Sequence, residues 1–332
     1  MRPLLHATLV NGRTGDPALY IETMFERRAM LFDLGDIGPL SPRDIQRLGH
    51  IFVSHTHIDH FVGFDRLLRV LVGREQTVRL YGPDGFIERV RHKLHAYSWN
   101  LVDRYQTDLV FVVTEIDPSL HTRTVRIRLK TGFAAEAATS GRLDGSVACS
   151  EPAFRVSVAV LAHSIPCLGF AIEETAHVNV WKPRLAELGL AVGPWLRNLK
   201  RAVVEGLPDD HSIRIGPGGR EIPLGELRQA YTVTPGQKIA YVTDAADTAA
   251  NRRAIIGLAA GADLLFIDAA FARADAARAA ERAHLTTVAA GEIARAAGVR
   301  RVEPFHFSPR YAGEESRLLD EVEATFAGNE VL

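Results

Sequence analysis

Four side chains that can bind a metal ion fall within one short segment of the chain: His55, His57, Asp59 and His60. They directly follow the apolar run 51–53, a pattern that predicts a β-strand delivering a polar loop. Residues two apart in extended backbone lie on one face, so His55 and His57 would point the same way. The helical pattern that follows would carry Asp59 and His60 to another side. One loop could therefore serve two metal ions.

Composition sets few further limits. The chain has 332 residues, 47% hydrophobic and 24% charged, which is ordinary for a globular protein and allows one large domain or two average ones. No apolar run approaches the ~20 residues of a membrane span, and the N-terminus lacks the apolar region of a signal peptide. Only Cys149 and Cys167 are present, without metal-type spacing, so a reducing cytoplasm is expected. The net charge of −1 argues against broad coating by nucleic acid but leaves a local basic patch open.

Strand and helix patterns alternate along the chain. Strands are predicted near residues 4–11, 17–22, 29–32, 51–53, 77–81, 109–113, 125–130, 154–161, 169–173, 239–242, 263–267 and 301–305, and helices near residues 61–72, 84–97, 248–260, 275–297 and 314–326. Ser41 followed by Pro42 predicts the start of a short helix, and Asp84 is the expected cap of another. Residues 134–150 read as a loop or poorly packed hairpin, and residues 176–235 as an inserted arm.

The remaining ligands are sought at the ends of other apolar strands, where the first loop also lies. Three residues satisfy this rule: His163, Asp244 and His306. With three or four protein ligands for each ion, two sites can be completed. One would use His55, His57 and His163, and the other Asp59, His60 and His306, with Asp244 left to bridge them. Two ions about 3.5–4 Å apart form the geometry used on phosphate esters.

Several segments resemble one known family. The segment 55–60 resembles the HxHxDH motif of the metallo-β-lactamase fold, and the later segments are similar to ribonuclease Z, the tRNA 3′-processing endonuclease. The matching segments are Ala162 to Phe170, a His-x-Thr segment at His284 to Thr286, an HxSxRY ending at His306 to Tyr311, and Gly193-Pro194 in the arm. The loops at 7–16 and 35–38 depart from the family, as does Asp268, which stands where a His-Glu-Ala-Thr segment is usual.

The resemblance implies an α/β fold: a four-layer αββα sandwich in which helices flank two mixed β-sheets. A single domain would span residues 1–332, with the arm at 176–235 as an RNA-binding or dimer-contact insert. The cofactors would be two divalent metal ions, zinc in the first place, with manganese or iron also suited to the ligand set. A homodimer is also implied.

The proposed chemistry is phosphodiester hydrolysis by a metal-bridging hydroxide. Asp59 would act as general base and His284 would protonate the leaving oxygen. Ser308 and Arg310 would bind the substrate phosphate. Asp33, Asp36 and Asp268 are expected to orient the ligands or stabilise their loops.

The predicted function is that of a ribonuclease Z-like endoribonuclease acting on the 3′ trailer of a tRNA precursor or a related RNA. The alternative is a hydrolase of the same fold acting on a small phosphodiester, cyclic nucleotide, lactone or β-lactam, without tRNA processing. A non-catalytic binding protein is a third class, which the complete ligand set disfavours. In the arm, Lys182, Arg184, Arg197, Lys200 and Arg201 suit RNA phosphates, whereas Trp181, Trp195 and Leu196 suit a dimer contact.

Overall fold

The computed structural model describes residues 5–23, 28–216 and 219–329. The chain divides into two compact units. The larger unit comprises Met1–Ser150, Arg155–Ile172 and Gln237–Leu332, and the smaller comprises Glu151–Phe154 and Glu173–Gly236. The predicted site residues all lie in the larger unit.

The first sheet of the larger unit has eight strands in the order β1-β2-β3-β4-β5-β6-β7-β8. Strands β3 to β6 are mutually parallel, while the pairs at both edges are antiparallel, so the sheet is mixed. The bounds are β1 Leu5–Leu9, β2 Leu19–Thr23, β3 Ala29–Phe32, β4 Leu48–Phe52, β5 Gln76–Pro83, β6 Leu109–Ile116, β7 His121–Arg128 and β8 Thr139–Arg142.

The second sheet has six strands in the order β18-β17-β16-β11-β10-β9. Strands β16, β17 and β18 are parallel, and β9 is antiparallel to β10, so this sheet is also mixed. The bounds are β9 Val147–Ser150, β10 Phe154–Ala162, β11 Pro166–Glu174, β16 Lys238–Val242, β17 Leu264–Asp268 and β18 Val302–Phe305.

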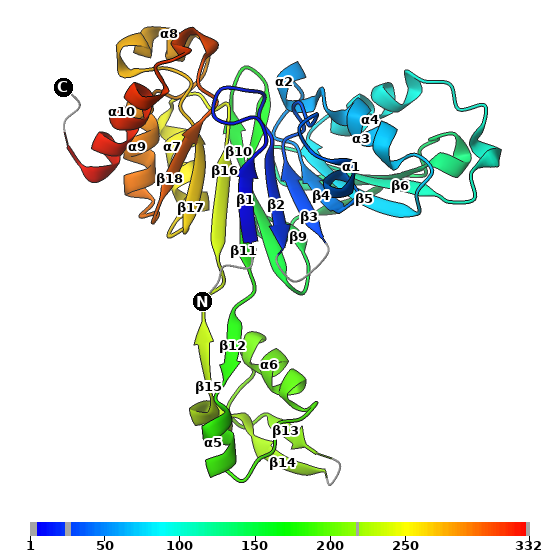
Figure 1. The fold of residues 1–332 in the computed structure, drawn as a ribbon, viewed down its shortest axis with the longest axis vertical. Coiled ribbons are helices and arrows are strands. Elements are labelled where there is room, and N and C mark those ends of the chain that lie inside the picture. Colours follow the sequence, from blue (N-terminus) through cyan, green and yellow to red (C-terminus); the bar gives the residue numbers. More distant parts are fainter. Residues whose placement is uncertain (1–4, 24–27, 217–218, 330–332) are drawn as a thin grey trace. The chain divides into compact units, whose positions relative to one another are not determined.

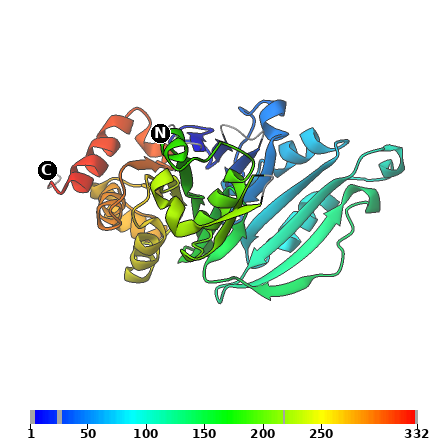
Figure 2. The ribbon, with the colours of Figure 1, turned by 90° about the horizontal axis from the view of Figure 1, so that it is seen from below.

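Helices cover the outer faces of both sheets (Figures 1 and 2). Those of the larger unit are α1 Pro42–Ile45, α2 Ile58–Phe61, α3 Phe64–Leu71, α4 Phe86–His95, α7 Ala249–Ala259, α8 Ala276–Glu281, α9 Thr287–Ala296 and α10 Glu315–Ala327. Short 3₁₀ turns lie at η1 Val102–Arg104, η2 Leu129–Thr131, η4 Arg273–Asp275 and η5 Pro309–Tyr311. Ser41 caps α1 as predicted, since its side chain accepts a hydrogen bond from the Asp44 amide.

Aromatic side chains join the two sheets. The ring of Phe170, on β11, lies 5.5 Å from that of Phe52 and 5.9 Å from that of Phe32. Tyr241, on β16, lies 6.0 Å from Phe32. All four side chains are almost fully buried, so they form a core between the sheets, with separate apolar cores under the helices on either side. The predicted four-layer αββα sandwich is confirmed.

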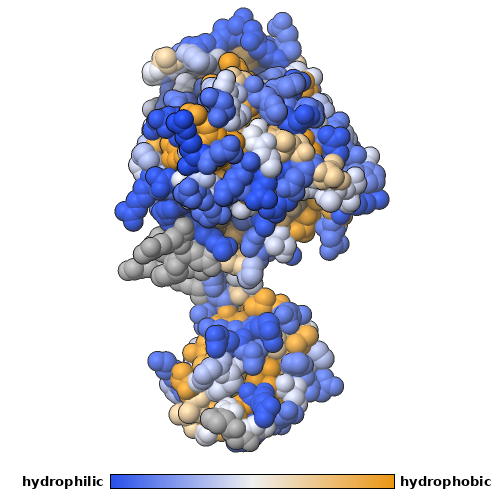
Figure 3. All heavy atoms as spheres, turned by 90° about the vertical axis from the view of Figure 1, so that its right-hand side faces the viewer, coloured by the Kyte–Doolittle hydropathy of each residue, from blue (hydrophilic) through white to orange (hydrophobic). Residues whose placement is uncertain are grey.

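The smaller unit has its own small core. It contains β12 His177–Val180, α5 Lys182–Glu187, α6 Leu196–Val204, β13 Ser212–Ile215, β14 Arg220–Pro223, η3 Leu224–Ala230 and β15 Tyr231–Thr234. Trp195 is 5% exposed and belongs to this core, so it is not available for a dimer contact. Trp181 is 53% exposed, and Figure 3 shows further hydrophobic residues scattered among hydrophilic ones on the unit's surface.

Three local predictions were wrong. The helix predicted at 275–297 is interrupted, because α8 ends before Ala283, whose φ of 56° is left-handed, and α9 begins only at Thr287. The segment 134–150 contributes β8 to the first sheet and β9 to the second. Helix α4 is preceded by Gly85 in a left-handed conformation, and is not capped by the side chain of Asp84.

Within the described residues, no helix is long and apolar enough to cross a lipid bilayer.

Candidate metal centre

The C-terminal ends of four strands deliver the predicted ligands. Strand β4 leads into the loop 54–57 and then α2, while β10, β16 and β18 end directly before or close to His163, Asp244 and His306. Parallel strands present their carboxyl ends at one edge of a sheet, which brings side chains from distant parts of the chain together.

The first group of possible ligands comprises His55, His57, His163 and Asp244. One ligand atom from each lies within 4.8 Å of the others. Asp244 Oδ2 is 3.4 Å from His55 Nε2 and 3.5 Å from His163 Nε2. The structure therefore brings together the histidines that the sequence assigned to one ion, with Asp244, which the sequence assigned as the bridge, beside them.

The second group comprises Asp59, His60 and His306, whose ligand atoms also lie within 4.8 Å of one another. Asp59 Oδ2 is 3.4 Å from His60 Nε2 and 3.5 Å from His306 Nε2. Asp244 adjoins this group too, with Oδ2 3.4 Å from His60 Nε2 and Oδ1 3.0 Å from His306 Nδ1. One carboxylate thus lies between the two groups.

Two buried nitrogen atoms of the cluster, His60 Nε2 and His306 Nδ1, make no hydrogen bond of suitable geometry with the described residues, although oxygens of Asp244 lie 3.4 and 3.0 Å from them. Burying a polar atom without a partner is costly unless something else satisfies it. Imidazole nitrogens and carboxylate oxygens are ligands of zinc and related divalent ions. The donor set and the two unsatisfied nitrogens therefore fit bound metal.

Contacts outside the cluster fix the ring orientations of three of these histidines. His163 Nδ1 lies 2.9 Å from the carbonyl oxygen of Ala283, and His55 Nδ1 lies 3.0 Å from Ser54 Oγ. His60 Nδ1 lies 2.8 Å from Asp33 Oδ2. With Nδ1 engaged in this way, each ring presents its Nε2 to the cluster, as is usual for histidines that bind metals.

Charge and burial oppose one another within the cluster. Burial, reinforced by neighbouring histidines, lowers the pKa of His55 to about 2, which keeps this imidazole neutral. Burial also disfavours a proton on His306, but the carboxylates of Asp244, Asp268 and Asp59 together outweigh it and hold the pKa of His306 well above its usual value. Burial would raise the pKa of Asp244, yet His306 and His60 hold it well below its usual value. A carboxylate that attracts protons onto its neighbours is also suited to attract a cation.

Asp268 and His284 form an adjoining pair. Asp268 Oδ2 lies 3.1 Å from His284 Nδ1 and accepts a hydrogen bond from the Leu285 amide at 3.3 Å. The side chain of His284 is partly exposed, whereas that of Asp268 is fully buried, and the carboxylate fixes one ring nitrogen of His284. Asp268, His284, Asp244 and His306 also offer ligand atoms within 4.8 Å of one another.

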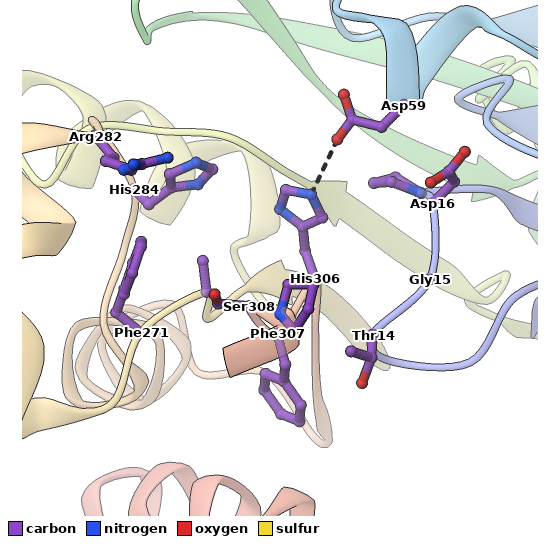
Figure 4. Close-up of a pocket in the computed structure, with 13 residues that line it drawn as sticks. Thr14, Gly15, Asp16, Asp59, Phe271, Arg282, His284, His306, Phe307 and Ser308 are labelled. Atoms are coloured by element: carbon purple, nitrogen blue, oxygen red, sulfur yellow. Dashed lines mark ion pairs between the residues drawn. The ribbon is translucent and has the colours of Figure 1, made fainter. Parts of the chain in front are cut away.

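A cavity of about 320 Å³ opens beside this cluster (Figure 4). It is lined by Thr14, Gly15, Asp16, Pro17, Asp59, Ala270, Phe271, Arg282, His284, His306, Phe307, Ser308 and Pro309. The predicted residues Asp59, His284, His306 and Ser308 are among them. Arg310 is not, since its guanidinium pairs with Asp275 at 3.1 Å.

Sequence reasoning missed Arg282 and Phe271. The only sequence signal for Arg282 was its place two residues before His284. The loop 7–16, which the sequence singled out for its departure from the family, reaches the site through contacts such as the Phe307 amide donating to the Arg13 carbonyl, and its residues 14–16 line the cavity.

Unfavourable backbone conformations concentrate at this site. Among the described residues, those other than glycine with positive φ are Asp33, Leu120, Phe133, Asp244, Ala283 and His306. Four of the six, Asp33 (60°), Asp244 (46°), Ala283 (56°) and His306 (62°), belong to or contact the cluster. Such residues are uncommon and persist where surrounding contacts hold them.

The model of the β-lactamase superfamily domain matches residues 19–220 and 211–307. Ribonuclease Z of Deinococcus radiodurans is 30% identical over 97% of this chain and 96% of its own length. Ribonuclease Z of Thermobifida fusca is 32% identical over 93% of this chain and 84% of its own length. The structure of human tRNase Z, short form, aligns with a TM-score of 0.53 at 18% identity, covering 92% of this chain and 91% of that one. The metallo-β-lactamase fold protein YhfI from Bacillus subtilis aligns with a TM-score of 0.54 at 15% identity, covering 97% and 93%.

The fold and the histidine–carboxylate cluster define a metal-dependent hydrolase of the metallo-β-lactamase superfamily. Within that superfamily, the chain belongs to the ribonuclease Z family. Divalent metal ions are the cofactors that this membership implies.

Proposed function

We propose that the cluster holds two zinc ions and hydrolyses a phosphodiester in RNA. His55, His57 and His163 would hold one ion, and Asp59, His60 and His306 the other, with Asp244 shared between them. The observation that carries this proposal is the position of the Asp244 carboxylate, which lies within 3.5 Å of nitrogens from both groups. Two divalent ions in such a site lower the pKa of a coordinated water and neutralise phosphate charge.

Asp59 and His284 would carry out the two proton transfers. Asp59 has one oxygen, Oδ2, near His60 and His306, which leaves Oδ1 to accept a proton from the attacking water. His284 would donate a proton to the leaving oxygen, because Asp268 holds its Nδ1 and the ring lines the cavity. The water oxygen then forms a bond to phosphorus as the bond from phosphorus to the leaving oxygen breaks.

We propose a tRNA precursor as the substrate, with its 3′ trailer removed. The relatives named ribonuclease Z support this choice. Because a mature tRNA ends in a free 3′ hydroxyl, the leaving oxygen would be the 3′ oxygen of the upstream nucleotide. Ser308 lines the cavity and would donate to the substrate phosphate. Arg310 is proposed to act on the phosphate only if it leaves Asp275.

The smaller unit would bind the body of the RNA. Arg197, Lys200 and Arg201 are exposed on α6 at spacings of three and four residues, so they share one face of the helix. None of the three is paired with a carboxylate among the described residues. Arg184, in contrast, is paired with Glu187 at 2.7 Å. Unpaired cations on one face suit contact with phosphates.

A cytoplasmic location and a homodimer are also proposed. Sedimentation of the purified chain would test the homodimer.

The test uses zinc-loaded protein with two substrates, bis-p-nitrophenyl phosphate and a precursor tRNA carrying a 3′ trailer. We expect hydrolysis of both, with the tRNA product ending in a 3′ hydroxyl at the trailer junction. Hydrolysis of the small diester alone would favour the alternative, a small-molecule hydrolase of the same fold. Failure to hydrolyse either, with metal bound, would refute the proposed function.

A further inference from the structure

Arg282 introduces an unpaired positive charge into the cavity beside the metal cluster. It contributes the only lysine or arginine side chain among the residues that line this cavity. Its guanidinium has no hydrogen bond or ion pair with any residue in the described part of the chain. The two neighbouring arginines of the same region differ: Arg310 pairs with Asp275, and Arg278 does not line the cavity. An arginine held without a carboxylate at a substrate cavity suits an anionic group of the substrate.

The backbone around Arg282 fixes where the side chain starts. The His284 amide donates to the Ala279 carbonyl at 2.9 Å, and the Ala283 amide donates to the Ala280 carbonyl at 3.2 Å. Together with the left-handed φ of Ala283, these bonds form a Schellman motif at the end of α8. Glycine is the usual residue at the left-handed position, and an alanine there carries strain. The Ala283 carbonyl also meets His163 Nδ1 at 2.9 Å, so one turn positions Arg282, His284 and a proposed ligand together.

The proposed proton transfers, on which this inference rests, define which side of the cavity holds the leaving group. Figure 4 draws Arg282, His284 and Phe271 on one side of the cavity and Asp59 on the opposite side. In an in-line displacement the attacking and leaving oxygens lie on opposite sides of phosphorus. Asp59 would serve the attacking water and His284 the leaving oxygen. Arg282 therefore stands on the side of the leaving group.

We propose that Arg282 binds a second phosphate of the substrate, namely the 5′ phosphate of the nucleotide that leaves through its 3′ oxygen. The planar guanidinium can make two parallel hydrogen bonds to one phosphate. The site then favours one kind of substrate, in which the nucleotide chain continues on the 5′ side of the cleaved bond. A diester with a single phosphate is bound less tightly. Arg282 is a specificity-determining residue in this account.

Two isomeric dinucleotides provide the test, because they have the same composition and nearly the same charge. In pUpU the additional phosphate lies on the leaving nucleoside, and in UpUp it lies on the other nucleoside. Each is measured as a competitor of bis-p-nitrophenyl phosphate hydrolysis, so that the result does not depend on its own cleavage. The wild-type protein should bind pUpU about tenfold more tightly than UpUp, since hydrogen bonds between charged groups are the stronger kind.

Arg282→Ala should remove this preference, with pUpU binding weakened about tenfold and UpUp changed less than about twofold. Arg282→Lys should restore part of it, because the charge remains but the planar fork is lost. Arg278→Ala, which removes an arginine one turn earlier on α8, should leave the preference intact. Equal weakening of both dinucleotides by Arg282→Ala, or no weakening of either, would overturn the inference.

The outcome stays separate from that of the proposed function. If the zinc-loaded protein hydrolyses no diester, the proposed function fails, and the same dinucleotides are titrated calorimetrically into wild-type and Arg282→Ala protein. A preference for pUpU that depends on Arg282 would then still support the phosphate site. Its absence would refute the site independently.

Discussion

In the metal-free protein, removal of the Asp33 carboxylate should destabilise the larger unit more than removal of any single proposed metal ligand. Asp33 is fully buried and lies directly after β3. It accepts hydrogen bonds from the Ser54 amide at 2.6 Å, from Ser54 Oγ at 2.8 Å and from the Tyr241 hydroxyl at 2.8 Å, and it meets His60 Nδ1 at 2.8 Å. These partners come from both sheets, so the carboxylate ties the two layers together at the site.

Asp33→Ala removes the acceptor of four buried groups: the Ser54 amide, Ser54 Oγ, the Tyr241 hydroxyl and His60 Nδ1, of which Ser54 Oγ keeps its contact with His55 Nδ1. Each such group costs about 1–3 kcal/mol when nothing replaces its partner. Partial rearrangement lowers the sum, whereas the left-handed φ of 60° at this position adds to it, because alanine tolerates that region less well than aspartate. We expect a loss of about 4 kcal/mol in the free energy of unfolding.

Urea unfolding of the metal-free protein, followed by circular dichroism, measures this loss. Tyr241→Phe removes one of the hydrogen bonds and should cost about 1 kcal/mol. Asp36→Ala is the matched control, because the exposed Asp36 carboxylate in the same loop accepts, among the described residues, only from the Gly38 amide, and the substitution should cost less than about 0.5 kcal/mol. A loss below about 1 kcal/mol for Asp33→Ala would refute the reasoning.

Three further substitutions test separate parts of the account. Ala283→Gly should raise the free energy of unfolding by about 1 kcal/mol, since glycine relieves the left-handed φ; a decrease in urea unfolding would contradict the strain. His284→Ala should lower kcat on precursor tRNA about 10²–10⁴-fold with zinc content unchanged and should affect bis-p-nitrophenyl phosphate far less, because p-nitrophenolate leaves without a proton; an unchanged kcat on the tRNA would exclude His284 as the acid. Replacing Arg197, Lys200 and Arg201 together by alanine should raise KM for precursor tRNA while leaving the small diester unaffected, and an equal effect on both substrates would argue against an RNA-binding arm.

The sequence predicted the alternating strands and helices because their determinants are local, whereas the four-layer arrangement was implied by the resemblance to the metallo-β-lactamase fold. Apolar runs of strand length that end in polar residues, such as 51–53 before the histidine loop, reveal both the strand and its functional end. The same rule singled out His163, Asp244 and His306, and the structure brings their side chains together with His55 and Asp59.

The parts that could not be predicted depend on contacts between distant segments. Ala283 interrupts an alanine-rich helical pattern, and nothing in its type announces a left-handed residue, because glycine is usual there. Arg282 reaches the cavity only because of that turn. All four residues of the segment 139–142 are exposed, and the segment joins the first sheet by pairing with β7, so its own pattern carries no buried face to detect.

The phosphate contact of Arg310 stays a prediction. The prediction came from its place in the segment 306–311. A residue that matches a motif can, however, be paired with a side chain outside that motif. Here Asp275 holds the guanidinium, and Tyr311 donates its hydroxyl to the same carboxylate. The cation that lines the cavity comes instead from the end of α8.

The zinc content of the purified chain tests the central claim most directly. After saturation with zinc and removal of the excess, elemental analysis should give about two ions per chain for the wild-type protein and for the control His92→Ala, which changes an exposed histidine of α4. His163→Ala and His306→Ala should each retain about one ion, because each removes a ligand from a different group. A wild-type chain that holds one ion or none, or variants that keep both ions, would contradict the account.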